Sequence, residues 1–298
     1  MPGLKEVRIR IASVRSTQQI TNAMKMVAAS KLRKAQTAIL KLRPYAAKLR
    51  EILQNLSSSI ENSSENTFSK ERDPNKILIV VIASNRGLCG GFNSNIIKAT
   101  QEFIETRYPA QFEKGNVSLI CIGRKASEFF SKKNYHVIEV RDDLLDSLRF
   151  DIVSLLAEKL MKAFTDKEYD RIHIIYNQFK NAAVQRLIME QFLPIVPAAQ
   201  ETKTKAIEKE VTADYIFEPD KETILRELIP KTLRIQLFKA ILDSFASEQG
   251  ARMTAMQKAT DNADDLLKEL QISYNKARQS TITNEILEIV NGAEALKG

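Results

Sequence analysis

Apolar and small residues near the N-terminus recur in alternating steps of four and three. Steps of this kind form the heptad seam of a left-handed coiled coil. Between Leu4 and Leu56 there is no glycine and a single proline, Pro44, which should bend a helix locally while the seam passes it in register. The pattern predicts one coiled-coil helix in residues 1–56, about 80 Å long. The seam comprises Ala28, Leu32, Ala35, Ile39, Leu42, Ala46, Leu49, Leu53 and Leu56.

A second seam occupies the C-terminal part, and we assign residues 221–298 to a second coiled-coil helix. Two long helices that leave one domain can pair only antiparallel, and this one is longer by about 15 to 20 residues, or about 25 Å. The stretch from Ile282 to Leu296 would then have no partner within the chain, so we expect another protein to bury it. The seam comprises Met256, Thr260, Ala263, Leu267, Leu270, Tyr274 and Ala277, then, after a phase slip, Ile282, Ile286, Ile289, Ala293 and Leu296.

The middle of the chain alternates short apolar runs with amphipathic ones. Residues 57–75 are polar and rich in Ser and Asn, which is typical of a linker. Residues 76–220 predict a central α/β domain. Strand–helix–strand repeats imply right-handed crossovers and a mainly parallel sheet. The predicted fold class is therefore α/β: a Rossmann-like domain with a mainly parallel sheet, flanked by a long antiparallel coiled coil. Strands are expected at 76–84, 117–123, 135–140, 170–179 and 184–195, and helices at 94–107, 124–133 and 148–164.

The positive charge of the chain is concentrated at one end. The net charge is +8, yet the first 50 residues hold twelve Lys and Arg and one acid, Glu6, so the remainder is slightly acidic. Such a segment favours an acidic partner. Nucleic-acid binding would favour interleaved aromatic residues, of which only Tyr45 is present. A membrane surface would favour a bulky apolar face rather than a narrow seam. An acidic protein surface fits best.

Several classes of function lack support in the sequence. The longest purely apolar run, from Ile77 to Ala83, is far shorter than the roughly 20 residues that span a bilayer. Two isolated cysteines and two histidines outside any cluster, Cys89, Cys121, His136 and His173, make neither a disulfide framework nor a metal site. We expect no cofactor, no metal and no catalytic residue.

One glycine-rich turn, from Asn85 to Asn93, follows the first predicted strand. Such turns can hold phosphate with backbone N–H groups at a helix N-terminus, which leaves a nucleotide-binding α/β enzyme as an alternative. The turn matches neither GxGxxG nor the P-loop, however. A tight strand-to-helix turn that needs positive φ is the interpretation we favour, with Cys89 as an unreactive thiol.

Four motifs along the chain are similar to one known family. They are MKMVAASKLRKAQ at 24–36, SNRGLCGGFN at 84–93, SEQGARMTAMQKATDN at 247–262 and ITNEILEIVNGA at 282–293. Together they resemble the gamma subunits of F-type (rotary) ATP synthases, over essentially the whole chain and in order. Asn85 stands where that family usually has Asp, and Gly250 where Ala is more usual.

The resemblance implies a central rotor shaft that transmits torque between a proton-driven c ring and an alpha/beta catalytic hexamer. Such a shaft is itself non-catalytic. Its partners would be the alpha, beta and epsilon subunits and the c ring, with no nucleic acid and no nucleotide bound directly. It would associate with the cytoplasmic side of a bacterial inner membrane through those partners alone. The alternative is a static coiled-coil adaptor of another multisubunit complex.

The resemblance also implies contact residues. Those expected to meet the beta subunit are Met24, Lys25, Lys31, Arg33, Arg252, Gln279 and Thr283. Those expected in an apolar sleeve at the apex of the hexamer are Ile286, Ile289 and Leu296. Tyr215 is expected to contact the c ring or the epsilon subunit.

Overall fold

The computed structural model describes residues 4–57, 68–182, 184–195 and 221–295. They fall into two compact units, which we describe separately. The helical unit comprises residues 1–29 and 252–298, and the sheet unit comprises residues 30–251. Helices α1 (Leu4–Ser57) and α7 (Lys221–Ala295) contribute to both units. Most of the predicted linker and all of residues 196–220 lie outside the described residues.

Helices α1 and α7 pair antiparallel in the helical unit. The Arg8 guanidinium donates to the Tyr274 hydroxyl at 3.4 Å, and the Gln18 amide donates to the Asp264 carboxylate. A step of ten residues forward on α1 thus corresponds to ten residues back on α7. The predicted antiparallel coiled coil is confirmed. The seam residues buried in this unit are Ala28, Met256, Thr260, Ala263, Leu267 and Leu270, and Val7, earlier on α1, is buried as well.

The seam of α1 continues into the sheet unit. Leu32, Ala35, Ile39 and Leu49 are buried there, while the side chains of residues 53 and 56 lie outside the described part. Pro44 lies inside α1, and the helix continues to Ser57. The prediction of one helix through the proline is confirmed, because buried side chains on both sides of Pro44 keep the same register.

The sheet unit contains a five-stranded sheet with the strand order β3-β2-β1-β4-β5. The first four strands are mutually parallel, and β5 runs antiparallel to β4. A mainly parallel sheet is therefore confirmed. The strands are β1 (Ile77–Ile82), β2 (Val117–Ile122), β3 (His136–Val140), β4 (Arg171–Phe179) and β5 (Gln185–Leu193).

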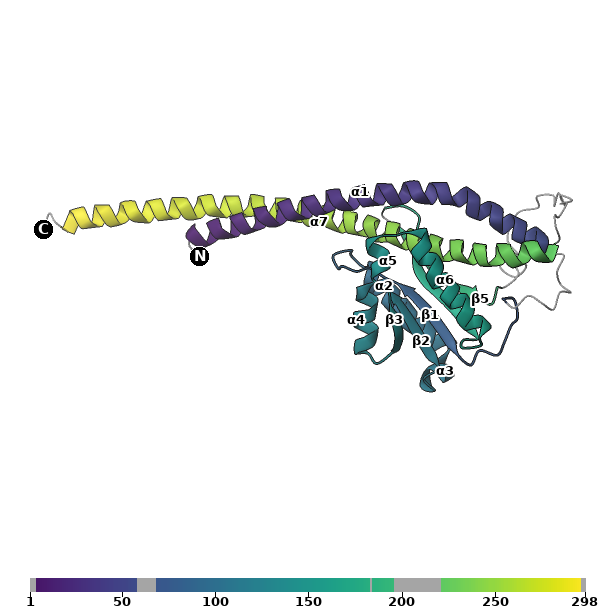
Figure 1. The fold of residues 1–298 in the computed structure, drawn as a ribbon. Coiled ribbons are helices and arrows are strands. Elements are labelled where there is room, and N and C mark those ends of the chain that lie inside the picture. Colours follow the sequence, from purple (N-terminus) through teal and green to yellow (C-terminus); the bar gives the residue numbers. More distant parts are fainter. Residues whose placement is uncertain (1–3, 58–67, 183, 196–220, 296–298) are drawn as a thin grey trace, which may run out of the picture. The chain divides into compact units, whose positions relative to one another are not determined.

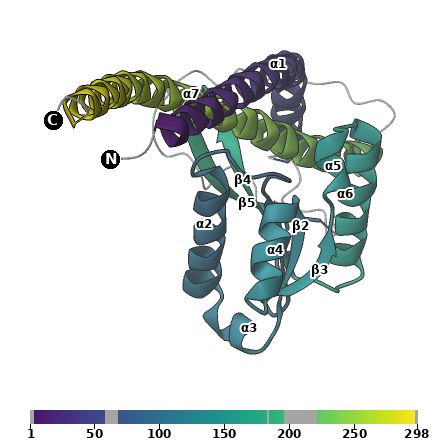
Figure 2. The ribbon, with the colours of Figure 1, turned by 90° about the vertical axis from the view of Figure 1, so that its left-hand side faces the viewer.

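Helices cover both faces of this sheet (Figures 1 and 2). One face packs against α2 (Phe92–Arg107) and α4 (Arg124–Lys132), and the other packs against α6 (Phe150–Thr165) and the first part of α7. All six residues of β1 are buried because alternate side chains enter different layers, which explains its unbroken apolar sequence. Two short helices, α3 (Pro109–Glu113) and α5 (Asp143–Asp146), were not predicted.

Helix α7 is bound to the sheet by hydroxyl groups and by one close backbone approach. The Ser244 hydroxyl donates to the Ile82 carbonyl at 3.3 Å, and the Ser247 hydroxyl donates to the Asn177 carbonyl at 3.0 Å. A Cβ added at Gly250 would lie 3.2 Å from both Cα and O of Ala182. The missing side chain at residue 250 therefore lets α7 approach the β4–β5 connection closely.

Candidate partner-binding surfaces

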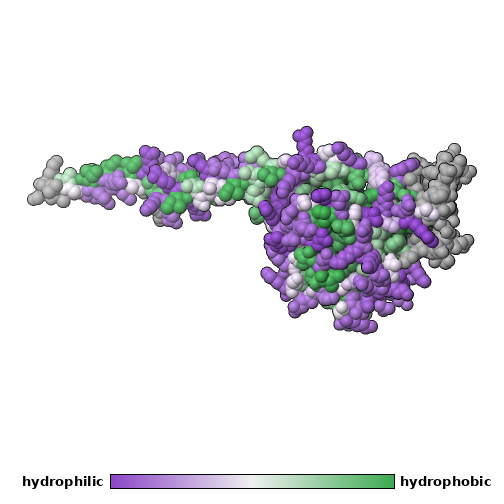
Figure 3. Space-filling view, in the orientation of Figure 1, coloured by the Kyte–Doolittle hydropathy of each residue, from purple (hydrophilic) through white to green (hydrophobic). Residues whose placement is uncertain are grey.

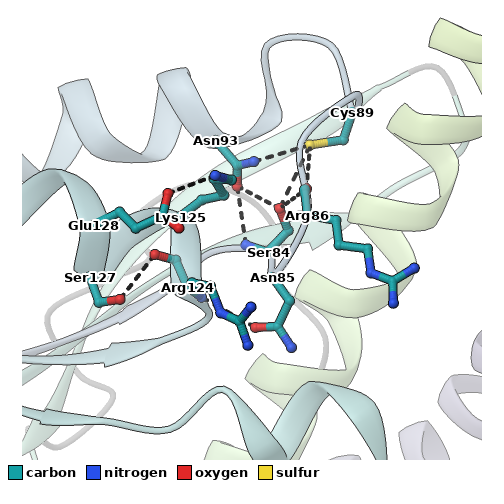
Figure 4. Close-up of polar contacts among 9 residues, drawn as sticks. All are labelled: Ser84, Asn85, Arg86, Cys89, Asn93, Arg124, Lys125, Ser127 and Glu128. Carbon is teal, nitrogen blue, oxygen red and sulfur yellow. Dashed lines mark hydrogen bonds and ion pairs between the residues drawn. The ribbon is translucent and has the colours of Figure 1, made fainter.

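The glycine-rich turn after β1 is a compact hydrogen-bonded structure (Figure 4). Asn93 Oδ1 accepts from the Ser84 backbone N–H at 3.1 Å and lies 2.9 Å from the Ser84 hydroxyl. Asn93 Nδ2 donates to Cys89 Sγ at 3.2 Å, and Cys89 is 1% exposed. Leu88 and Gly90 have φ of +61° and +58°. The prediction of a tight turn with positive φ is confirmed.

Asn85 makes one contact that a carboxylate could not make, the donation by its amide nitrogen. Its Nδ2 donates to the Asp142 carbonyl at 2.9 Å, and its Oδ1 accepts from the Arg124 backbone N–H at 3.2 Å. Arg124 also forms an ion pair with the Asp142 carboxylate at 2.9 Å, and this hydrogen bond lowers the pKa of Asp142. An aspartate at residue 85 would place an acceptor against the Asp142 carbonyl. The amide at residue 85 thus suits its surroundings.

The geometry around this turn does not favour a nucleotide site. In doubly wound sheets, ligands bind at the carboxyl ends of the strands where the crossover connections change face. That point lies between β1 and β4, because α2 and α4 cover one face and α6 covers the other. Helix α7 reaches the same strands there, through the Ser244 and Ser247 hydroxyls. The crevice is therefore filled by the chain itself.

The buried thiol and imidazole groups are held neutral. Burial raises the pKa of Cys121 to about 12. Burial, with smaller effects from the Arg171 and Arg107 charges, lowers the pKa of His173 to about 4. The His173 Nε2 lies 2.7 Å from the Tyr108 hydroxyl, so the neutral ring has a hydrogen-bond partner inside the core. Both groups belong to the packing of the sheet.

The described residues provide neither a metal-binding cluster nor a membrane-spanning helix. Among these residues, no group of three or more His, Cys, Asp or Glu side chains could hold a metal ion. In the same part of the chain, no helix is both long and apolar enough to cross a membrane.

The residues expected near the beta subunit on α1 fall in both units. Met24 and Lys25 are half-buried in the helical unit, and Lys31 and Arg33 are exposed in the sheet unit. The two exposed cations are free of the coiled-coil seam, since the neighbouring seam residue, Leu32, is buried. They can therefore contact a partner without opening the helix pair.

The corresponding residues on α7 differ in exposure. Arg252 is only 9% exposed and takes part in interactions within the chain. Gln279 and Thr283 are exposed, and the Thr283 hydroxyl donates to the Gln279 carbonyl at 2.9 Å. A contact through Gln279 or Thr283 needs no rearrangement, whereas a contact through Arg252 needs this side chain to become accessible.

The end of α7 is exposed on all sides. Every residue from 278 to 294 is exposed, including Ile286 at 55% and Ile289 at 71%. Leu287 and Val290, which the seam did not include, are also exposed and broaden the apolar stripe. Figure 3 shows hydrophobic surface along this end of α7. Leu296 and Tyr215, the other two predicted contact residues, lie outside the described residues.

Sequence analysis missed a second apolar stripe, on the exposed side of α1. Ile9, Ile20 and Val27 are 62%, 58% and 57% exposed. Their spacings of eleven and seven residues place them on one face of a helix. The sequence contains this pattern, because the three apolar residues repeat at helical spacing on a face other than that of the seam. Branched apolar residues on the outer face of a two-stranded coiled coil do not contribute to packing between its helices. This face therefore also suits a partner.

Comparisons with known proteins show similarity over almost the whole chain. Residues 3–296 match the family described as ATP synthase. The ATP synthase gamma chain of Flavobacterium psychrophilum is 54% identical over 299 residues, with 100% of each chain covered. That of Cytophaga hutchinsonii is 52% identical over 297 residues, with 99% of each chain covered.

Solved structures show the same fold. A chain of the Tetrahymena thermophila mitochondrial ATP synthase, from a structure of its central stalk and c ring, is 26% identical, with a TM-score of 0.58. The match covers 80% of the present chain and 99% of that one. A chain of the Euglena gracilis mitochondrial ATP synthase has a TM-score of 0.67 at 20% identity and covers 98% of this chain and 94% of its own. The second likeness concerns the fold alone.

Proposed function

The chain belongs to the ATP synthase gamma-chain family, and we propose that it is the central rotating shaft of an F-type ATP synthase. In this role it transmits torque between a proton-driven c ring and a hexamer of alpha and beta subunits. It carries no bond chemistry itself. The same proposal places it on the cytoplasmic side of a bacterial inner membrane, held there by its partners.

The observation that carries this proposal is the apolar end of α7, which has no partner among the described residues. The pairing of Arg8 with Tyr274 sets the start of α1 opposite residue 278 of α7. Beyond that point α7 continues to Ala295, which is about 17 residues or about 25 Å. A lone helix with five large apolar side chains exposed, at residues 282, 286, 287, 289 and 290, is poorly stable in water. A surrounding sleeve of other chains would stabilise it.

The charge distribution supports the same kind of partner. The excess of Lys and Arg over Asp and Glu is confined to the first 50 residues, which form most of α1. Two of these basic residues, Lys31 and Arg33, are exposed. Acidic side chains lining a cavity would gain favourable Coulomb energy from these cations, and the low dielectric of a cavity would strengthen that gain. The exposed stripe of Ile9, Ile20 and Val27 would meet apolar surface of the same sleeve.

A shaft must also carry torque from the sheet unit into the helices. Helix α7 runs without a break from Lys221 to Ala295 and is bound to the sheet by Ser244 and Ser247. The buried side chains of Ile229, Leu233 and Leu237 pack in the same core as α6. Rotation of the sheet unit would therefore turn α7 with it. An asymmetric shaft then favours a different conformation in each beta subunit in turn.

Copurification tests the assignment. The tagged chain, expressed in its native context, should recover alpha, beta and epsilon subunits and the c ring. Cross-linking Thr283→Cys on α7 to a cysteine in a beta subunit should stop ATP hydrolysis, and reduction of the cross-link should restore it. A static adaptor would copurify with other proteins, or would tolerate the cross-link without loss of hydrolysis.

A further inference from the structure

A pocket of about 390 Å³ lies within the sheet unit and takes its walls from α1, α6 and α7. The proposed function makes no use of this pocket. Part of its lining is apolar and well packed, because Ile235 on α7 is only 4% exposed and Leu42 on α1 is half-buried. Pockets of about 300–1,000 Å³ are typical of sites for small organic molecules. The space therefore suits a compact ligand.

Two aromatic side chains of the lining remain open to solvent. Tyr45 on α1 and Phe150, the first residue of α6, are 45% and 42% exposed. The Phe150 ring is held in place by an edge-to-face contact with Phe238, with 5.4 Å between the ring centroids. Aromatic rings pair favourably with further aromatic rings, in offset-stacked or edge-to-face geometry. The lining therefore favours a flat aromatic body over an aliphatic chain.

The charged side chains of the lining favour a negative group on that body. Lys231 and Arg234 contribute two positive charges, and Glu227 contributes one negative charge. The Lys231 ammonium lies 5.9 Å from the centre of the Tyr45 ring, so this cation is adjacent to one aromatic wall. Arg234 already forms an ion pair with Glu158 at 3.2 Å. The exposed Lys231 is therefore the cation best placed to meet a ligand.

The helix that carries Tyr45 adds further positive charge around the pocket. No acidic residue occurs between Glu6 and Glu51, and Lys41 and Arg43 in this stretch of α1 are exposed. Their charges attract an anion and repel a cation, and the effect weakens at high salt. An anionic ligand is therefore favoured over a cationic one.

We propose that this pocket binds a small aromatic carboxylate, with its rings against Tyr45 and Phe150 and its carboxylate on Lys231. The inference is independent of the proposed function, since it concerns the sheet unit alone. A molecule in this position contacts α1, α6 and α7 at once. Because it binds only the folded chain, it also stabilises the packing of these three helices.

The probe for this site is 2-naphthoate, which combines two fused rings with one carboxylate. Titration of the full-length chain, followed by saturation-transfer NMR of the ligand, should give a Kd of about 1 mM or lower, as expected for a ligand of this size. The uncharged 2-naphthamide, with the same rings, should bind about ten-fold more weakly. Decanoate, an aliphatic carboxylate, should also bind more weakly than 2-naphthoate.

Substitutions locate the bound probe. Lys231→Gln should weaken binding of 2-naphthoate about ten-fold and remove its advantage over 2-naphthamide. Tyr45→Leu should weaken both aromatic ligands about three-fold and keep that advantage. Both side chains are exposed, so the unfolding temperature without ligand should stay close to that of wild type. The matched control is Lys98→Gln, at an exposed lysine of α2 outside the pocket, which should bind 2-naphthoate like wild type.

Several results would overturn the proposal. It is wrong if 2-naphthoate does not bind, if 2-naphthamide or decanoate binds equally well, or if Lys98→Gln has the same effect as Lys231→Gln. It is also wrong if 2-naphthoate binds the isolated chain but not the chain within its complex, because a partner then covers the pocket. Copurification of synthase subunits is a separate measurement, so failure of the proposed function would leave the outcome at the pocket unchanged.

Discussion

At the scale of single residues, Asp243 is a buried carboxylate that should destabilise the sheet unit at neutral pH. It lies in α7, is 2% exposed, and its Oδ1 has no hydrogen-bond partner among the described residues. Burial raises its pKa to about 6, and the charge of Glu190 acts in the same direction, while Lys239 and Arg43 act against both. Between about pH 4 and pH 6, the folded state therefore keeps a proton on Asp243 that the unfolded state has already lost.

Replacing Asp243 with asparagine should stabilise the protein at neutral pH. A carboxylate with a raised pKa contributes a penalty that is absent below its unfolded pKa and complete above the folded one. Asp243→Asn should thus raise the free energy of unfolding at pH 7.5 by about 1–3 kcal/mol and change it little at pH 4. Urea unfolding of the full chain at several pH values measures this difference.

The control for this measurement is Asp73→Asn, because Asp73 is an exposed carboxylate in the same unit. It should leave stability unchanged at both pH values. The comparison must be between variant and wild type, because His173 acts in the opposite direction: its pKa of about 4 makes stability fall as pH drops from about 6.5. An Asp243→Asn variant that is no more stable than wild type at pH 7.5 would contradict the assignment.

The turn and Asp243 show how far residue-level prediction reaches. The glycines between Asn85 and Asn93 made a tight turn predictable, because they tolerate positive φ. They did not show that Leu88 would also adopt it, since a leucine carries no such signal. Asp243 was also missed. Its helix packs on several sides within the sheet unit, and a one-face helical pattern cannot reveal burial all round.

At the scale of elements, the two glycines of α7 have different surroundings. A Cβ at Gly250 would lie 3.2 Å from the Ala182 backbone, whereas a Cβ at Gly292 would meet nothing within 4 Å. Both glycines lower helix propensity by about 1 kcal/mol relative to alanine. Only at Gly250 does packing oppose a larger side chain.

Gly250→Leu should therefore destabilise the sheet unit by about 1–3 kcal/mol, because the side chain would force α7 away from the β4–β5 connection. Urea unfolding of the full chain measures this loss. Gly292→Ala is the matched control and should leave global unfolding unchanged. It should slow amide exchange in residues 285–292 by about five-fold, as expected for 1 kcal/mol of local helix stability. Equal stability of Gly250→Leu and wild type would show that α7 and Ala182 do not meet.

Long elements were predicted well and short ones poorly, for a physical reason. The seams of α1 and α7 extend over many turns, so one irregularity such as Pro44 could not hide the period. Helices α3 and α5 have five and four residues, too few to display a period. The antiparallel direction of β5 was also beyond prediction, because alternation along a strand carries no information on its neighbour's direction.

At the scale of the whole molecule, the basic excess of the first 50 residues is the feature that the fold alone does not explain. Lys31 and Arg33 are exposed and flank the buried Leu32, so their charges are unnecessary for helix pairing. In the proposed function, these charges face acidic side chains of a beta subunit. Charges enclosed between chains interact more strongly than exposed charges. Salt largely screens exposed charges that are more than about 10 Å apart.

Reversing both charges, as Lys31→Glu with Arg33→Glu, should weaken coupling without unfolding the chain. In inverted membrane vesicles, we expect ATP-driven proton pumping per ATP hydrolysed to fall several-fold, since a repelled beta subunit no longer follows the shaft. The unfolding temperature of the isolated chain should change by no more than a few degrees, because both residues are exposed.

A matched reversal elsewhere decides whether position or net charge matters. Lys132→Glu with Lys133→Glu makes the same change in net charge at the exposed end of α4. It should leave coupling intact, because these lysines lie outside the basic α1 segment. If both double variants lose coupling equally, the effect belongs to net charge alone. If neither does, the cations of α1 serve solubility, and apolar contacts of Ile9, Ile20, Val27 and the α7 end must carry the torque unaided.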